Sequence, residues 1–114
     1  MEIRIVTDTI HEDELRILGK DFYGEMIKGV VDLAREIVAF GGEYHMDANK
    51  VLLHDGSVQS DMWGFNWYFD VPSDDKIEYT SLINIRPLQG NRGMEVLDED
   101  IRVRMSEIIR KKVI

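Results

Sequence analysis

The spacing of apolar residues at the start of the chain predicts one strand and one helix. Ile3 and Ile5 alternate with polar residues in 2–7, a pattern typical of a short strand. Thr9 and Glu12 have the spacing of a capping box, in which two side chains bind the free backbone N–H groups at the start of a helix. We therefore expect a helix to begin here.

The segment 22–40, "FYGEMIKGVVDLAREIVAF", repeats its apolar residues every three or four positions. This period is typical of a helix, and the width of the apolar stripe indicates a helix that lies deep against a sheet. Gly41 and Gly42 would end it. The central stripe consists of Phe22, Met26, Val30, Leu33 and Ile37.

Asp55–Gly56 favours the tight turn of a β-hairpin. A turn there would pair 43–54 with 57–68 in a fixed register. One face of the paired strands would be apolar, formed by Tyr44, Met46, Ala48, Trp63, Phe65 and Trp67. The other face would be polar, formed by Glu43, His45, Asp47, Asn66 and Tyr68 beside Gly64.

This register fails near the turn, where four apolar residues would lie on the polar face: Val51, Leu53, Val58 and Met62. Either a bulge shifts the phase at 49–50 or 60–62, or the tip of the hairpin packs elsewhere. An apolar tip docked on a second subunit would make the protein a homodimer, and this is our prediction for its oligomeric state.

Alternation returns in 77–86 and predicts a last strand that Pro87 ends. After a loop, Asp98 is placed to cap a final helix with a buried stripe of Ile101, Met105 and Ile108. The basic residues 110–112 fit the last turn of that helix, where cations complement its dipole. The predicted order is β-α-β-β-β-α, an α+β fold whose helices cover one face of a mostly antiparallel sheet.

Composition limits the classes of function. The 114 residues suffice for a single domain, and 44% hydrophobic with 32% charged residues is typical of a globular protein. There is no cysteine, which suits a reducing compartment, and no apolar run long enough for a membrane span or a signal peptide. We therefore expect a cytoplasmic protein without a membrane partner. A formal charge of −8 opposes nucleic-acid binding.

The polar face of the predicted hairpin is the first candidate site. On a strand, Glu43, His45 and Asp47 would point the same way at intervals of ~6.6 Å. Together with Asp61 they could hold a divalent metal ion, which would suit water activation by an enzyme. Alternatively the face is merely solvated, and Arg86 neutralises Asp47 or Asp61 in an ion-pair network.

The second candidate site is the segment "NIRPLQGNRG" at 84–93. Arg86 and Arg92 could hold a carboxylate or a phosphate, since a guanidinium matches the geometry of these anions. Asparagine is a poor strand former, so its recurrence in this part of the chain favours a role in hydrogen bonding. Further candidates for ligand contacts are therefore Asn66, Asn84 and Asn91.

Four stretches of the sequence together resemble a known family: "MIKGVVDLAREI", "GGEYHMDANKVLLHDGS", "QSDMWG" and "SLINIRPLQGNRG". The family consists of small archaeal and bacterial proteins classed only as a domain of unknown function, and the resemblance spans about residues 2–112. It implies no activity, substrate or cofactor. It implies only that the segments around 43–47, 61–66 and 84–92 are hallmarks of the family.

These observations favour a non-enzymatic binding or interaction module that uses the polar sheet face. The alternative is a metal-dependent or anion-handling enzyme, with Glu43, His45 and Asp47 at its centre and Arg86 holding an anionic group. The expected partners are a second copy of the chain and a small anionic ligand.

Overall fold

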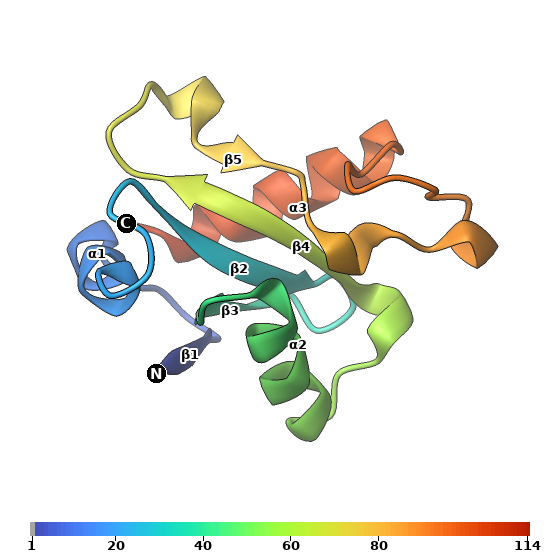
Figure 1. Ribbon diagram of the computed structural model, residues 1–114, viewed down its shortest axis with the longest axis horizontal. Coiled ribbons are helices and arrows are strands. Elements are labelled where there is room, and N and C mark those ends of the chain that lie inside the picture. The colour runs from blue at the N-terminus through green and yellow to red at the C-terminus, as the bar shows by residue number, and fades with distance from the viewer. Residues whose placement is uncertain (1) are drawn as a thin grey trace.

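The computed structural model describes residues 2–114, and within them the chain forms a five-stranded antiparallel sheet and three α-helices (Figure 1). The strands lie in the order β1-β3-β2-β4-β5. The α+β class predicted from the sequence is confirmed, whereas the order along the chain is β-α-β-β-α-β-β-α. The elements are β1 (Ile3–Val6), α1 (Glu12–Gly19), β2 (Met26–Asp32), β3 (Ile37–Gly41), α2 (His45–His54), β4 (Met62–Tyr68), β5 (Ile77–Glu78) and α3 (Glu99–Lys112). None of these helices has the length and the apolar character that crossing a membrane requires.

The segment 22–40 contains the β2–β3 hairpin, so the predicted long helix is wrong. In the turn, Asp32 Oδ1 accepts hydrogen bonds from the backbone N–H groups of Ala34 (2.9 Å) and Arg35 (3.0 Å). Both strands lie inside the sheet and are buried on both faces, so their apolar residues form a nearly continuous run. Such a run also fits a helical stripe. The β-branched pair Val30–Val31 was the better signal.

The predicted hairpin of 43–68 is also wrong, because its first half forms helix α2. Ala48 and Leu52 are four residues apart in this helix and are fully buried against the sheet. Gly56 ends the helix with a φ of +105°, and Ser57 N–H donates to the Leu52 carbonyl (2.9 Å). A glycine with positive φ serves hairpin turns and helix ends alike, so Asp55–Gly56 is ambiguous in the sequence.

The helices cover both faces of the sheet rather than the single face we predicted. α1 and α3 pack on the face that carries Trp63, Phe65 and Trp67, whereas α2 packs on the opposite face (Figure 1). The alternation within β4 is nevertheless as predicted. Its rings point to the α1–α3 face, which leaves Gly64 and Asn66 on the α2 face.

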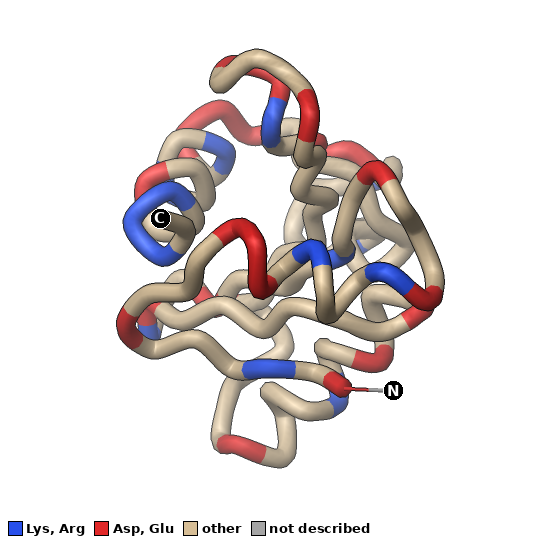
Figure 2. The backbone as a smooth tube through the Cα atoms, turned by 90° about the vertical axis from the view of Figure 1, so that its left-hand side faces the viewer, with Lys and Arg blue, Asp and Glu red and all other residues tan. Residues whose placement is uncertain are grey.

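The last helix is as predicted. Asp98 Oδ1 accepts hydrogen bonds from the N–H groups of Asp100 (2.8 Å) and Ile101 (3.3 Å), and Met105 and Ile108 are buried. Its last turn carries Arg110, Lys111 and Lys112. Figure 2 shows this basic turn beside the C-terminus.

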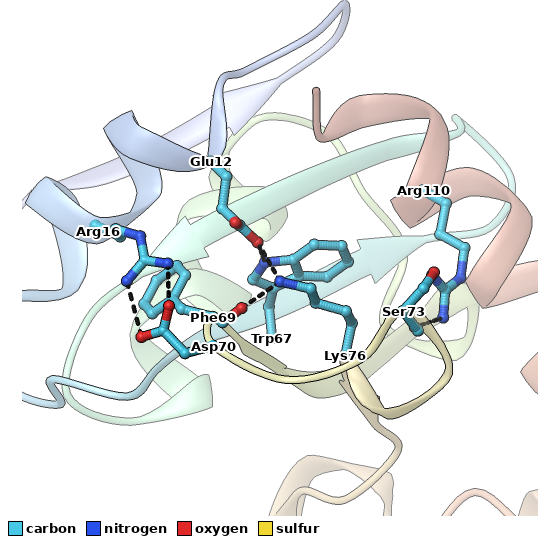
Figure 3. A network of polar contacts seen from close by, with 8 residues as sticks. All are labelled: Glu12, Arg16, Trp67, Phe69, Asp70, Ser73, Lys76 and Arg110. Carbon is cyan, nitrogen blue, oxygen red and sulfur yellow. Dashed lines mark hydrogen bonds and ion pairs between the residues drawn. The ribbon is translucent and has the colours of Figure 1, made fainter.

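α1 begins at Glu12 with His11 as its N-cap, so the predicted capping box of Thr9 and Glu12 does not form. The Glu12 carboxylate is engaged elsewhere. Its Oε2 accepts hydrogen bonds from Trp67 Nε1 (2.8 Å) and Lys76 Nζ (2.9 Å) (Figure 3). One turn further, both terminal nitrogens of Arg16 bind the Asp70 carboxylate. These contacts tie α1 to the connection between β4 and β5.

Gly29→Ala should destabilise the fold, because the Phe65 ring occupies the space that a Cβ would need. A Cβ at position 29 would lie 2.4 Å from Phe65 Cζ, and Phe65 packs edge-on against Phe40 with ring centroids 5.7 Å apart. Overpacking of this kind costs about 1–3 kcal/mol, which urea unfolding would measure. The matched control is Gly24→Ala, since no atom lies within 4 Å of a Cβ there. Equal losses in the two variants would contradict the steric explanation.

Candidate functional site

A pocket on the α2 face of the sheet brings together polar and apolar side chains from separate segments. It has a volume of about 220 Å³ and lies between β2, β4, the start of α2 and the segment 80–94. It is lined by Lys28, Tyr44, His45, Asn66, Thr80, Ser81, Leu82, Ile83 and Met94. We call it the α2-face pocket.

His45 is the first residue of α2 and is 7% exposed. Its Nε2 lies 2.8 Å from the Phe65 carbonyl oxygen. Because a carbonyl can only accept, Nε2 carries the hydrogen, and the neutral ring keeps an acceptor lone pair on Nδ1. Burial, with a smaller effect from the charge of Lys28, lowers the pKa of His45 to about 4, although the Phe65 carbonyl and the nearby Asn66 side chain oppose this shift. The imidazole is therefore neutral at pH 7.

Asn66 lines the same pocket and has one amide atom without a partner. Its Nδ2 donates a hydrogen bond to Glu78 Oε1 (2.7 Å), which fixes the orientation of the amide because a carboxylate only accepts. Oδ1 is buried and has no hydrogen bond within the described residues, and the whole residue is 6% exposed. A buried acceptor without a donor is rare in folded proteins, and it marks Oδ1 as an atom that can accept from a ligand.

Lys28 brings a positive charge to the pocket from β2. It lies opposite Asn66 in the β2–β4 ladder, and Asn66 lies opposite Glu78 in the β4–β5 ladder. The ammonium group lies 5.0 Å from the centroid of the Tyr23 ring and forms none of the ion pairs found within residues 2–114. Burial lowers the pKa of Lys28, an effect that Glu78 partly opposes. An anion bound in the pocket would stabilise this charge.

The predicted metal cluster does not form. Among residues 2–114, no group of three or more His, Cys, Asp or Glu side chains is placed to hold a metal ion. The cause is helix α2, in which alternate residues point in different directions. Asp47 caps this helix, since its Oδ2 accepts from the backbone N–H groups of Glu43 (3.1 Å) and Tyr44 (3.0 Å). The Glu43 side chain is exposed, and Asp61 lies beyond the helix in a 3-10 turn.

Arg86 binds backbone carbonyls, so its guanidinium is not an open anion site. It donates hydrogen bonds to the carbonyls of Ile83 (3.0 Å), Gln59 (3.0 Å) and Met62. Its guanidinium carbon also lies 4.2 Å from the centroid of the Trp63 ring. Burial lowers the pKa of Arg86. These contacts occupy most of the donors that an anion would need.

Asn84 takes the place of a longer β5. The strand predicted over 77–86 is wrong beyond its first two residues, because β5 ends at Glu78 and the fully buried Asn84 binds the edge of β4 instead. Its Oδ1 accepts from Gly64 N–H (2.8 Å), and its Nδ2 donates to the Gly64 carbonyl (3.0 Å). Position 64 needs glycine, since a Cβ there would lie 2.6 Å from Ser81 Oγ. The close approach makes the segment after β5 one wall of the α2-face pocket.

Asn91 holds the remainder of that segment in shape. Its Nδ2 donates to the carbonyls of Asn84 (2.8 Å) and Glu95 (2.9 Å), and its Oδ1 accepts from Leu97 N–H (2.9 Å). Arg92 is exposed and does not line the pocket. The predicted anion loop is thus a segment bonded to itself and to β4.

Two of the residues predicted from the sequence, His45 and Asn66, line the pocket. Four polar lining residues were not predicted: Lys28, Tyr44, Thr80 and Ser81. A signal for Lys28 was present, because a lone lysine inside the apolar run "MIKGVV" is unusual: lysine is rarely buried without a partner. No comparable signal marks Thr80 or Ser81.

The buried His45 should make the protein less stable in mild acid. Between pH 6.5 and about 4 only the unfolded chain binds the proton, so the free energy of unfolding falls as the pH falls through this range. The full effect is about 3 kcal/mol, taken from the difference of the two pKa values. Denaturant unfolding at a series of pH values would measure it. His45→Gln, which cannot titrate, should flatten the curve, and the control His54→Gln at the exposed end of α2 should not. A His45→Gln curve parallel to that of the wild type would contradict the prediction.

Residues 4–112 match the family described as "Protein of unknown function (DUF5674)". No curated protein and no solved structure matches the chain. The match covers every residue that lines the α2-face pocket and confirms the resemblance seen in the sequence. The chain therefore belongs to this family of proteins of unknown function.

Proposed function

We propose that this protein is a non-enzymatic binding module that holds a small anionic molecule in the α2-face pocket. One observation carries the proposal: among residues 2–114, a half-buried Lys28 has no ion-pair partner and lies opposite Asn66, whose buried Oδ1 has no donor. Burying a charge and a polar atom without partners opposes folding, and a bound ligand would offset both costs. The absence of cysteine fits a site of action in the cytoplasm.

The state of His45 favours binding over acid–base catalysis. A general base works best with a pKa near the operating pH, whereas burial holds the pKa of His45 at about 4. The three other residues of the alternative enzymatic site do not join His45: Asp47 caps α2, Arg86 binds backbone carbonyls, and Glu43 is exposed. His45 is better suited to act as a fixed hydrogen-bond acceptor.

The mouth of the pocket supports a ligand that also has an apolar part. Three of its lining residues expose large apolar surfaces, with exposed fractions of 62% for Tyr44, 70% for Leu82 and 43% for Met94. Ligand sites commonly combine such walls with a few convergent polar groups. The volume of about 220 Å³ lies below the ~300–1,000 Å³ of drug-sized sites, so the ligand is small.

Self-association remains a prediction, but different exposed apolar residues now support it. The hairpin tip that suggested it is absent, and Met62 is fully buried in the core. Leu53 and Val58, at the end of α2 and just after it, are 41% and 58% exposed. A homodimer would cover these side chains, and sedimentation at high micromolar concentration would detect it.

Lys28→Met should abolish anion binding while it preserves the fold. A thermal-shift screen of acetate, inorganic phosphate, small carboxylic acids and phosphate esters would first identify anions that stabilise the wild type. Calorimetric titration of the best of them should show a loss of at least about tenfold in affinity for Lys28→Met, because the charge-assisted contact disappears. The matched control is Lys50→Met, which removes an exposed lysine of α2 outside the pocket. Equal affinity in both variants would place the anion elsewhere.

A further inference from the structure

Resting on the proposed function, we infer that the anionic group of the ligand is the carboxylate of a small 2-amino or 2-hydroxy acid with an apolar side chain. Its carboxylate would bind Lys28, and its amino or hydroxyl group would donate to Asn66 Oδ1. The juxtaposition of a cation with acceptor atoms in one pocket is the basis of this inference.

The acceptor atoms exclude a ligand that is only an anion. Asn66 Oδ1 has no hydrogen to give, because its amide is oriented by the bond from Nδ2 to Glu78. His45 Nδ1 has none either, because the ring hydrogen is on Nε2 and faces the Phe65 carbonyl. A simple carboxylate offers these atoms nothing but further acceptors. A ligand that also bears an N–H or O–H group would satisfy them.

The ladder register favours a ligand whose two polar groups are close together. Lys28 and Asn66 are direct partners in the β2–β4 ladder, and side chains at such positions begin about 5 Å apart. A donor on the carbon next to the carboxylate keeps both groups within this short span. Ser81 can assist the carboxylate, since its Oγ accepts from Ile83 N–H (3.2 Å) and its own hydrogen remains free to donate.

A row of charged and polar side chains across the sheet also fits a ligand that bears both a carboxylate and a donor. Glu78 follows Asn66 on the next strand, so an ammonium group, an amide and a carboxylate succeed one another across β2, β4 and β5. The bond to the Glu78 carboxylate polarises the amide and strengthens Oδ1 as an acceptor. The apolar side chain of the ligand would face Leu82, Ile83 and Met94 at the mouth.

A series of four ligands of equal carbon skeleton tests the inference on the intact protein by calorimetric titration. The series consists of leucine, 2-hydroxy-4-methylpentanoate, 4-methylpentanoate and leucinamide. We expect leucine, the hydroxy acid or both to bind at least about tenfold more tightly than 4-methylpentanoate, which lacks the donor. Leucinamide, which lacks the carboxylate, should bind at least as weakly as 4-methylpentanoate. The order of the first two distinguishes an amino acid from a hydroxy acid.

Asn66→Ala tests which atom recognises the donor. In this variant the affinity for 4-methylpentanoate should stay unchanged. Leucine and the hydroxy acid should bind about as weakly as 4-methylpentanoate, so that the tenfold preference is lost. The matched control is Gln89→Ala, which removes an exposed side-chain amide outside the pocket and should keep the preference. A preference that survives in Asn66→Ala would overturn the role of Oδ1. If this variant fails to fold, the ligand series on the wild type still decides the inference.

The binding results distinguish a wrong ligand class from a pocket that binds no anion. If 4-methylpentanoate and leucine bind equally well, the protein binds small anions but the inferred ligand class is wrong. If none of the four binds, the inferred class is also wrong, and the screen of acetate, phosphate and phosphate esters then decides the proposed function separately. Binding of leucinamide as tight as that of leucine would remove Lys28 from the recognition.

Discussion

Strand β4 is the element on which the rest of the structure depends, because two faces and one edge of it must be satisfied at once. On one face its rings fill the core beneath α1 and α3, and the Phe65 ring takes the space that Gly29 leaves open. On the other face it needs a small residue at Gly64, where the chain after β5 approaches closely. Its outer edge is paired with β5 over Asn66 and Trp67, so the remainder of the edge needs other partners.

Side chains supply those partners, and the candidate site follows from this solution. Asn84 binds both backbone groups of Gly64, and Arg86 binds the Met62 carbonyl. Buried backbone groups must be paired, so these two side chains do the work of a longer edge strand. Because the chain leaves the sheet after Glu78, Thr80 and Ser81 are free to turn over the α2 face and enclose a pocket. A regular fifth strand would have left that face open.

The sequence correctly predicted those elements whose residue pattern fits only one kind of secondary structure. Asp98 can cap only a helix that follows it, and the alternating rings of β4 fit only a strand. The failures occurred where two structures share a signal: a run buried on both faces for β2 and β3, and a glycine with positive φ after α2. His45 and Asn66 were expected together as a cross-strand pair. They meet in the pocket because the start of α2 lies over β4. The two residues are therefore close together as predicted, although His45 lies in a helix and not in the predicted strand.

Lys28 could not be assigned to the site for a related reason: a helix at 22–40 would have removed it from the ladder that places it opposite Asn66. Its charge matters more because the chain as a whole is acidic, with acidic positions recurring along its elements (Figure 2). A net charge of −8 does not attract anions over long distances, so an anion must gain its affinity from contacts inside the pocket. There, lower solvent exposure strengthens the contact with Lys28 and equally raises the cost of an unsatisfied Asn66 Oδ1. Burial thus has two effects: it strengthens the attraction of Lys28 for a carboxylate, and it makes the Asn66 amide discriminate against ligands that lack a donor.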